Sequence, residues 1–561
     1  MSKREKMLFA VVFFFSLLFS IIELIGISAF IPLITMITNP EWINVNHYLG
    51  YIYKLFKFTS SMQFIRVFGL AVVFFYIARG AYSLFYNYIV YRFSYNRKHV
   101  FAAKLFENYM GLPYLSFVKK NSSEMSKAIV IETYYLAFIL NQLLFFMSEF
   151  ILFFFLYCLM LLSNCQITIM ASIFIGSIVL ISSKVTSKKI KWHGSRREEL
   201  AGQLFKIINE SMNNFKIIKL FPDSQKVTER VNIINSNLSR EFINHNMLLI
   251  ITKNLLETLG FVVLISIVMY LYMEWDDTRA IIPLISTFVL ALYRMLPAAN
   301  KIVGHYNNML YGYKSLDLIY NELQHPIPLE GNKNIDYKKN IQFNNVSFGY
   351  EDNNKHILHK VSLKICKGSK IGVIGESGSG KSTFINLVIG LIKPSEGEIM
   401  IDGITITDEN IKSWRQRIGY IPQEIYLFDG NVAENVSFGH AYDNNKIFKC
   451  LKSANLHDFL SKNNGLETPV GENGVLLSGG QKQRIGIARA LYGDPEILIF
   501  DEATSALDLE TENKIVEEIF SIGKDKTLII VAHRPSMIRN CDVVYKLENG
   551  NLISLAEQLL D

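Results

Sequence analysis

The chain has 561 residues, of which 50% are apolar and 13% aromatic, and its formal net charge is +7. Its length exceeds that of one compact core, and its mean hydropathy of +0.22 excludes an ordinary soluble protein. A positive charge can indicate a nucleic-acid partner, but the basic residues gather beside apolar stretches in the first half of the chain. This pattern favours anionic lipid headgroups and no nucleic acid.

Six apolar stretches in the first half are long enough to cross a membrane. The first follows a short basic N-terminus, exceeds the length of a signal peptide and lacks a small-residue cleavage site, so we interpret it as an uncleaved membrane helix. The six stretches cover residues 7–37, 62–91, 128–162, 166–183, 254–273 and 279–300. They predict an all-α transmembrane domain of six long helices within residues 1–322.

The connections between these stretches differ in charge. Segments 92–127 and 184–253 are rich in lysine and arginine, whereas segments 38–61, 163–165 and 274–278 are short or poorer in them. Basic connections tend to stay in the cytoplasm. We therefore expect a multi-pass membrane protein whose N-terminus and C-terminal domain are both cytoplasmic.

Several segments outside the spans carry structural signals. Residues 40–58 place aromatic and aliphatic side chains at helical spacing, as in a short helix at the outer interface or one that merely caps the bundle. The two basic segments are amphipathic and each is broken once, at 111–117 and at 213–216, so we expect helices that extend into the cytoplasm. The stretch 323–340, rich in Asn, Lys and Pro, is interpreted as a linker.

Residues 371–382 form a short apolar strand that runs into a glycine-rich loop. The glycines let the backbone turn tightly, so that successive amide groups point at phosphate oxygens at the start of a helix. Lys381 then reaches the β and γ phosphates, and the Ser382 hydroxyl ligates Mg²⁺. The spacing predicts a nucleotide-phosphate site rather than an ordinary tight turn.

A second apolar strand, residues 495–500, ends at Asp501 and Glu502. This position suits a metal ligand followed by a general base that polarises water. Upstream, residues 477–481 precede a helical run with small residues at its start, and such a helix N-terminus can receive a phosphate.

Three further residues have side chains that fit an ATP site. Gln423 and His533 follow apolar strands and are suited to the γ phosphate, and Tyr350 offers a flat ring to adenine. For each of the three taken singly, a structural role is an open alternative.

In this order the motifs resemble the nucleotide-binding domain of ATP-binding cassette (ABC) exporters over residues 340–555. The resemblance implies an α/β P-loop domain with an antiparallel β subdomain at 341–561, with ATP and Mg²⁺ as cofactors. It also implies a homodimer, in which each ATP lies between the loop of one chain and residues 477–481 of the other. The breaks at 111–117 and 213–216 then resemble the two cytoplasmic coupling segments of these exporters. The implied catalytic residues are Glu502, Gln423 and His533, and the implied metal ligands are Ser382, Gln423 and Asp501. The implied ATP contacts are Tyr350, Gly375, Glu376, Ser377, Gly378, Ser379, Gly380, Lys381, Ser382, Thr383, Ser478, Gly479, Gly480, Gln481 and Asp508.

Four cations lie at or near membrane depth: Arg79, Lys253, Arg294 and Lys301. Ionisable residues there tend to face a bundle interior or a cavity, and cations suit an anionic cargo such as a phosphate or pyrophosphate. In the alternative interpretation these side chains snorkel or form ion pairs. The candidate partners are Glu23, Glu149 and Glu257.

Residues 195–199, 213–216, 289–297 and 299–301 resemble the PglK-type branch of ABC exporters, the flippases of lipid-linked oligosaccharides. This resemblance implies an oligosaccharide on polyprenyl pyrophosphate as cargo, moved from the cytoplasmic to the periplasmic leaflet of the bacterial inner membrane for protein N-glycosylation or O-antigen assembly. It also implies that the four cations face the pyrophosphate and that the 40–58 helix engages the lipid tail. The alternatives are an exporter of lipid A or drugs and, in a different class, an ATP-gated channel or a non-transporting ATPase.

Overall fold

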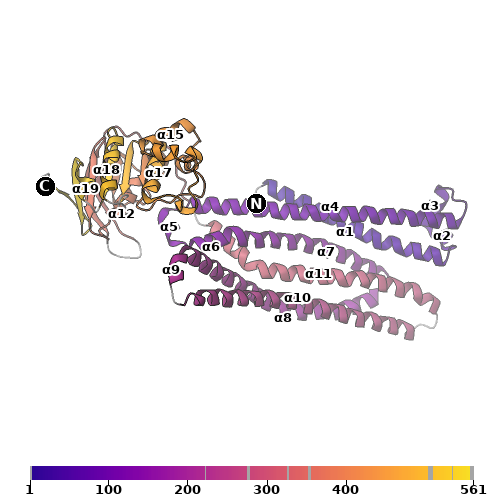
Figure 1. Ribbon diagram of the computed structural model, residues 1–561. Coiled ribbons are helices and arrows are strands. Elements are labelled where there is room, and N and C mark those ends of the chain that lie inside the picture. The colour runs from indigo at the N-terminus through magenta and orange to yellow at the C-terminus, as the bar shows by residue number, and fades with distance from the viewer. Residues whose placement is uncertain are drawn as a thin grey trace. The chain divides into compact units, whose positions relative to one another are not determined.

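The computed structural model describes residues 3–163, 165–220, 223–274, 278–324, 327–350, 356–502, 509–532 and 535–555. Its chain divides into two compact units (Figure 1). The helical unit comprises Met1–Gly111 and Lys119–Pro326, and the nucleotide unit comprises Leu112–Val118 and Ile327–Asp561.

The helical unit is built from long, roughly aligned helices (Figure 1). These are α1 (Lys3–Thr38), α4 (Ser61–Met110), α7 (Thr133–Ser163), α8 (Cys165–Asn213), α10 (Gln225–Glu274) and α11 (Thr278–Gln324). Because a helix rises about 1.5 Å per residue, a helix of the length of α4 spans about 75 Å, whereas the hydrocarbon core of a bilayer is about 30 Å thick. These helices are therefore long enough to continue well beyond a membrane.

Among the described residues, four helical stretches are long and apolar enough to cross a membrane: Lys3–Gly26, Ser61–Met110, Ser122–Leu162 and Gln225–Tyr270. The predicted spans 166–183 and 279–300 lie in α8 and α11, where many side chains are outside the description. The count of six spans stays a prediction.

Short helices fill the turns of this unit. They are α2 (Trp42–Val45), α3 (His47–Leu55), α6 (Ser122–Lys127), the π-helical turn Ala128–Glu132 and α9 (Phe215–Leu220). Asn46 is the N-cap of α3, and its side chain accepts hydrogen bonds from the Tyr48 and Leu49 amides at 3.1 and 3.2 Å. Leu49 packs inward with Met36 and Phe64. Tyr48 and Leu55, from the apolar face that the sequence singles out, are instead exposed.

The nucleotide unit contains two sheets. The larger has the strand order β10-β9-β3-β8-β7-β6, and its strands are parallel except for the antiparallel β9–β10 pair. Its strands are β3 (Lys370–Gly375), β6 (Ile418–Ile421), β7 (Ile497–Asp501), β8 (Thr527–Val531), β9 (Val543–Glu548) and β10 (Asn551–Leu555). The smaller sheet is antiparallel, in the order β2-β1-β4-β5. Its strands are β1 (Asn340–Phe348), β2 (Leu358–Cys366), β4 (Glu396–Ile401) and β5 (Ile404–Thr405).

Two apolar cores support these sheets. The first, which we call the loop core, contains Phe343, Phe384 and Trp414 and lies beneath β1, β3 and α12. The second, the helical core, contains Leu451, Ile485 and Phe500. The helices of this unit are α5 (Tyr114–Lys119), α12 (Lys381–Ile389), α13 (Ile411–Arg415), α14 (Val432–Ser437), α15 (Asn444–Ser453), α16 (His457–Ser461), α17 (Gly479–Tyr492), α18 (Leu509–Ile522) and α19 (Pro535–Ile538), with short 3₁₀ turns at Gly465–Glu467 and Glu472–Gly474.

The segment predicted as a linker, 323–340, is more ordered than its composition indicates. α11 runs to Gln324, and Ile335 and Tyr337 are buried in the loop core. The Tyr337 hydroxyl also lies 2.8 Å from the Thr527 hydroxyl at the start of β8. Two apolar side chains in a polar stretch are thus enough to fix the end of this segment onto the nucleotide unit.

Candidate functional site

The site lies where four parallel strands end side by side. β3, β8, β7 and β6 are consecutive neighbours in the larger sheet. β3 leads into the glycine loop, β7 ends at Asp501, and β6 ends two residues before Gln423. Because the carboxyl ends of parallel strands meet at one edge, residues far apart in the sequence converge there.

The loop between β3 and α12 closes around the ammonium group of Lys381. Gly378 and Gly380 have φ values of +82° and +107°, which favour glycine, and Gly380 is the N-cap of α12. The Lys381 Nζ donates to the carbonyl oxygens of Gly375 and Glu376 at 2.9 and 3.0 Å. The lysine is only 6% exposed. The fold therefore fixes the Lys381 ammonium group beside the N-terminus of α12.

Crowding at Gly375 excludes a side chain there. An added Cβ would lie 2.6 Å from both the Leu547 carbonyl oxygen and the Ser379 Oγ. The Ser379 Oγ is buried and has no hydrogen-bond partner among the described residues. A buried hydroxyl of this kind commonly has an additional partner, and here it lies in the loop for which the sequence predicts phosphate binding. In the first turn of α12, Ser382 is exposed and Thr383 is buried.

The two carboxylates after β7 have different environments. Asp501 accepts a hydrogen bond from the Tyr420 hydroxyl at 3.1 Å. Burial raises the pKa of Asp501, and the Tyr420 hydrogen bond lowers it. Glu502 has a left-handed backbone with φ of +50°, and its amide donates to the Val531 carbonyl oxygen at 2.9 Å. Since non-glycine residues rarely adopt this conformation, the turn is strained and aims the glutamate away from the strand direction.

Glu502 joins the glycine loop to Gln423, in the segment that follows β6. Its Oε1 lies 3.6 Å from the Lys381 Nζ, and its Oε2 accepts from the Gln423 Nε2 at 2.9 Å. The structure thus brings together three predicted site residues, Lys381, Gln423 and Glu502. Two other predicted site residues, Asp508 and His533, lie outside the described residues.

The second predicted phosphate-binding helix N-terminus, that of α17, belongs to a different part of the nucleotide unit. Ser478 caps α17 in a reciprocal pair with Gln481, because the Ser478 side chain accepts from the Gln481 amide and the Gln481 side chain accepts from the Ser478 amide. α17 packs on α14 and α15 over the helical core, whereas α12 belongs to the loop core. Tyr350 is half-buried, and its ring lies edge-on to Phe348 with centroids 5.2 Å apart.

Sequence reasoning missed Tyr420. This residue alternates on β6 with the buried Gly419 and Ile421, so its side chain faces away from theirs. A signal was present, because a polar-tipped aromatic residue three positions before Gln423 near the end of a strand is well placed to reach a neighbouring strand end. The pairing of β6 with β7 that makes the contact possible comes only from the fold.

In the helical unit, three of the four predicted cavity cations have carboxylate partners. Arg79 donates to both carboxylate oxygens of Glu23 at 2.8 and 2.7 Å, and Glu23 is 3% exposed. The Lys301 Nζ lies 2.6 Å from Glu149, and the Lys253 Nζ lies 3.9 Å from Glu257. The side chain of Arg294 is outside the described part of α11. The ion-paired alternative therefore describes these three cations, with the partners that the sequence offered.

One of these pairs borders a cavity of about 320 Å³ among α1, α4, α7 and α11. Glu149 is buried, whereas the Lys301 side chain is 55% exposed. The lining mixes aromatic rings with hydroxyl, amide and charged groups: Phe19, Ser83, Tyr86, Asn87, Tyr91, Phe145, Ser148, Glu149, Lys301 and His305.

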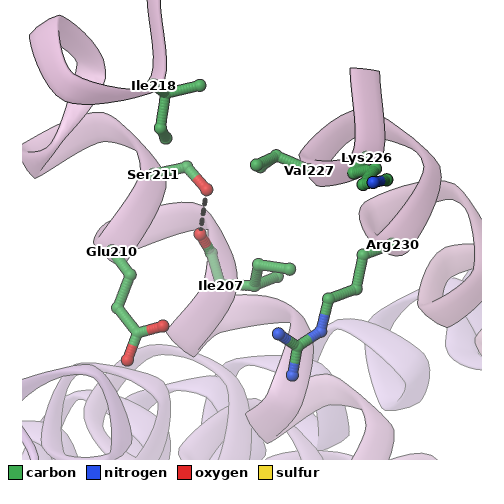
Figure 2. A pocket seen from close by; sticks show the side chains of 7 residues that line it. All are labelled: Ile207, Glu210, Ser211, Ile218, Lys226, Val227 and Arg230. Atoms are coloured by element: carbon green, nitrogen blue, oxygen red, sulfur yellow. Dashed lines mark hydrogen bonds between the residues drawn. The ribbon is translucent and has the colours of Figure 1, made fainter. Parts of the chain in front are cut away.

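A second cavity, of about 290 Å³, marks the junction of α8, α9 and α10 (Figure 2). It is lined by Ile207, Glu210, Ser211, Ile218, Lys226, Val227 and Arg230. The only hydrogen bond drawn runs from the Ser211 hydroxyl to the Ile207 carbonyl oxygen at 2.6 Å, and it lies within one helix. The cavity follows from the sharp turn of the chain near the predicted break at 213–216.

Comparisons with known proteins bear on both units. Residues 358–505 match the family described as ABC transporter, and residues 6–292 match the ABC transporter transmembrane region. The ATP-dependent lipid A-core flippase of Wigglesworthia glossinidia brevipalpis is 30% identical over 88% of this chain and 86% of that protein. The flippase of the same description from Pasteurella multocida (strain Pm70) is 28% identical over 88% and 86%. A solved bacterial Atm1-family ABC exporter with ATP bound has a TM-score of 0.80 at 21% identity, over 98% of this chain and 94% of that chain, and shares its fold.

Proposed function

Because the chain belongs to the ABC transporter family and couples ATP hydrolysis to transport, we propose that it flips a phosphorylated glycolipid across the bacterial inner membrane. The first candidate cargo is lipid A-core. This choice corrects the order of the cargo predictions, since relatives that align over most of the chain are described as lipid A-core flippases. An oligosaccharide on polyprenyl pyrophosphate becomes the second candidate.

ATP hydrolysis is assigned to the cluster around Lys381. In this proposal Lys381 and the loop amides hold the phosphates, and Glu502, oriented by Gln423, accepts a proton from the attacking water. The oxygens of Ser382, Asp501 and Gln423 are the ligand type that Mg²⁺ prefers, so these residues fit the ion. When bound, Mg²⁺ neutralises charge on the phosphate oxygens. The Ser478 helix end lies on the other core, which fits an ATP shared between two chains of a homodimer.

The observation that carries the cargo proposal is the cavity beside Lys301. Glu149 holds the lysine at 2.6 Å while more than half of the lysine side chain stays accessible, so its ammonium group can also meet an anionic headgroup. Aromatic faces such as Tyr91, with polar groups such as Asn87, suit a sugar ring better than a purely apolar drug.

Both candidate cargoes carry long apolar chains, and α3 offers a surface for them. The apolar face of α3 is exposed, with Tyr48 at 79% and Leu55 at 59%. Such a face can pack against the acyl or prenyl chain of a lipid at the membrane interface. It fits a long polyprenyl tail and the acyl chains of lipid A alike.

Purified protein in proteoliposomes tests the assignment. We expect lipid A-core to stimulate ATP hydrolysis and to become accessible on the opposite leaflet only with ATP, while Glu502→Gln gives neither. Parallel vesicles contain polyprenyl-pyrophosphate oligosaccharide. Stimulation and movement with that lipid alone would replace the first candidate by the second, and movement of neither lipid would overturn the glycolipid proposal.

Lys301→Ala tests the cavity. We expect the lipid A-core concentration for half-maximal stimulation to rise about tenfold, the lower end for a lost charge-assisted hydrogen bond, because the lysine is partly exposed. Lys314→Ala is the matched control, since Lys314 is on the same helix and pairs with Asp317 at 3.3 Å. Equal half-saturation in the two variants would remove Lys301 from the cargo site.

A further inference from the structure

Gln423 lies in the loop between β6 and α14, and the chain is fixed on both sides of it. Two residues before it, Ile421 pairs with Phe500 in the parallel register of β6 and β7. Two residues after it, Ile425 packs against the helical core, so close to α17 that a Cβ added to Gly486 would lie 2.5 Å from the Ile425 Cδ1. The direction of the Gln423 side chain therefore depends on the contacts that fix the chain from residue 425 onward.

Arg489, in the last turn of α17, bonds this loop from the helix side. Its Nη1 donates to the Tyr426 carbonyl oxygen at 2.9 Å. Its Nε donates to the Asn435 carbonyl oxygen at 2.7 Å, and its Nη2 donates to the Asn435 Oδ1 at 2.9 Å. The guanidinium thus uses three donors in fixed directions, a geometry that the single ammonium group of a lysine cannot reproduce.

Asn435 carries this contact across the rest of the loop. It is 0% exposed, and its Oδ1 also accepts from the Phe428 amide at 2.9 Å. Its Nδ2 donates to the carbonyl oxygens of Phe428 and Asn431 at 2.9 and 3.0 Å. Because a buried amide group in such a network needs all of its partners, a change at Arg489 shifts the loop as a whole.

We propose that Arg489 is a positioning residue for ATP hydrolysis, which fixes the loop so that the Gln423 amide reaches the Glu502 carboxylate. The Gln423 Nε2 lies 2.9 Å from the Glu502 Oε2, and a hydrogen bond of this length is lost when the loop moves by about 1 Å. Arg489 acts through Gln423, because its own hydrogen bonds go to the loop. The inference rests on the proposed role of Gln423, but on neither candidate cargo.

A merely structural role predicts different kinetics. If Arg489 only stabilised the fold, Arg489→Lys would lower the thermal midpoint, and the protein that stays folded would hydrolyse ATP with an unchanged kcat. If Arg489 positions Gln423, the kcat of the folded protein falls. The affinity for ATP then persists, because the contacts that shape the Lys381 loop do not involve Gln423.

The test measures kcat for ATP and the Kd of a non-hydrolysable ATP analogue on the full-length protein. Each rate is expressed per nucleotide site titrated in the same sample, so that a loss of folded protein does not mimic a loss of rate. We expect Arg489→Lys to lower kcat about fivefold and to leave Kd within about twofold. Gln423→Ala should lower kcat about tenfold, and the double variant should also lower it about tenfold rather than about 50-fold, because both changes act through one contact.

Arg484→Lys is the matched control, because Arg484 is on the same helix but donates to the Asn455 carbonyl oxygen at 3.1 Å, outside the loop. Its kcat should stay within about twofold of the unmodified protein. An unchanged kcat in Arg489→Lys, or a double variant whose effect is the product of the single effects, would overturn the proposal. An unchanged kcat in Gln423→Ala would remove its premise, and the proposal with it, while Glu502 kept its assigned role.

Discussion

Replacement of Glu502 by Gln is expected to lower ATP hydrolysis at least about 100-fold, the smaller effect typical of a lost general base. Glutamine has the same shape, so the amide of residue 502 still bonds Val531 and the Lys381 loop keeps its own carbonyl contacts. The substituted side chain can no longer accept a proton from water. Phosphate release should therefore fall while ATP binding persists, and both are measured on the purified protein.

Glu548→Gln provides the control for this substitution. Glu548 ends β9, is about half exposed and pairs with Lys546 at 2.9 Å on the surface. The ATP hydrolysis rate of the Glu548→Gln protein should therefore stay within about twofold of that of the unmodified protein. A Glu502→Gln protein that retained a tenth or more of the activity would assign the proton to another group. His533, which lies outside the described residues, would then be the next residue to test.

Much of the geometry of the candidate ATP site could be predicted from the sequence because its signals are local. The strand predicted before the glycine loop and the strand predicted before His533 correspond to β3 and β8 (Thr527–Val531). The strand predicted at 495–500 is β7, shifted toward Asp501. The glycine conformations and the Lys381 contacts depend on residues within one short loop.

The remaining features depend on packing between distant segments. The Tyr420–Asp501 bond joins positions 81 residues apart and requires β6 beside β7. The burial of Tyr337 requires a core formed by β1, β2 and α12, which a polar stretch does not reveal. Even the turn at Glu502 takes its left-handed backbone from the strand ends around it, not from the residue type.

The cations of the helical unit also divide into those whose partner is close in the sequence and those whose partner is distant. Lys253 and Glu257 are four residues apart on one helix, so their pairing can be expected from spacing alone. Arg79 and Glu23 are 56 residues apart, and Lys301 and Glu149 are 152 apart. Only the packing of α1 on α4 and of α7 on α11 decides whether such cations are paired or free. A paired cation with an accessible head, such as Lys301, can still serve a cargo, whereas a cation held bidentately contributes first to the fold.

Arg79→Ala is accordingly expected to destabilise the protein by about 3–5 kcal/mol, because it leaves the Glu23 carboxylate without its bidentate partner in a site that is 3% exposed. Thermal denaturation of the purified protein should show a lower midpoint and a lower yield of folded material. Arg66→Ala on the same helix is the control, since Arg66 is exposed and should change the midpoint little.

The double variant Glu23→Gln/Arg79→Gln decides between a structural and a cargo-binding Arg79. Two amides can hydrogen-bond in place of the ion pair, so stability should recover most of the loss, and the recovered protein can be assayed for lipid A-core stimulation. Full stimulation in the double variant assigns Arg79 to the support of α1 on α4. Stable protein without stimulation would instead return Arg79 to the cargo path, and an unchanged midpoint in Arg79→Ala alone would mean that the ion pair contributes little to the packing of these helices.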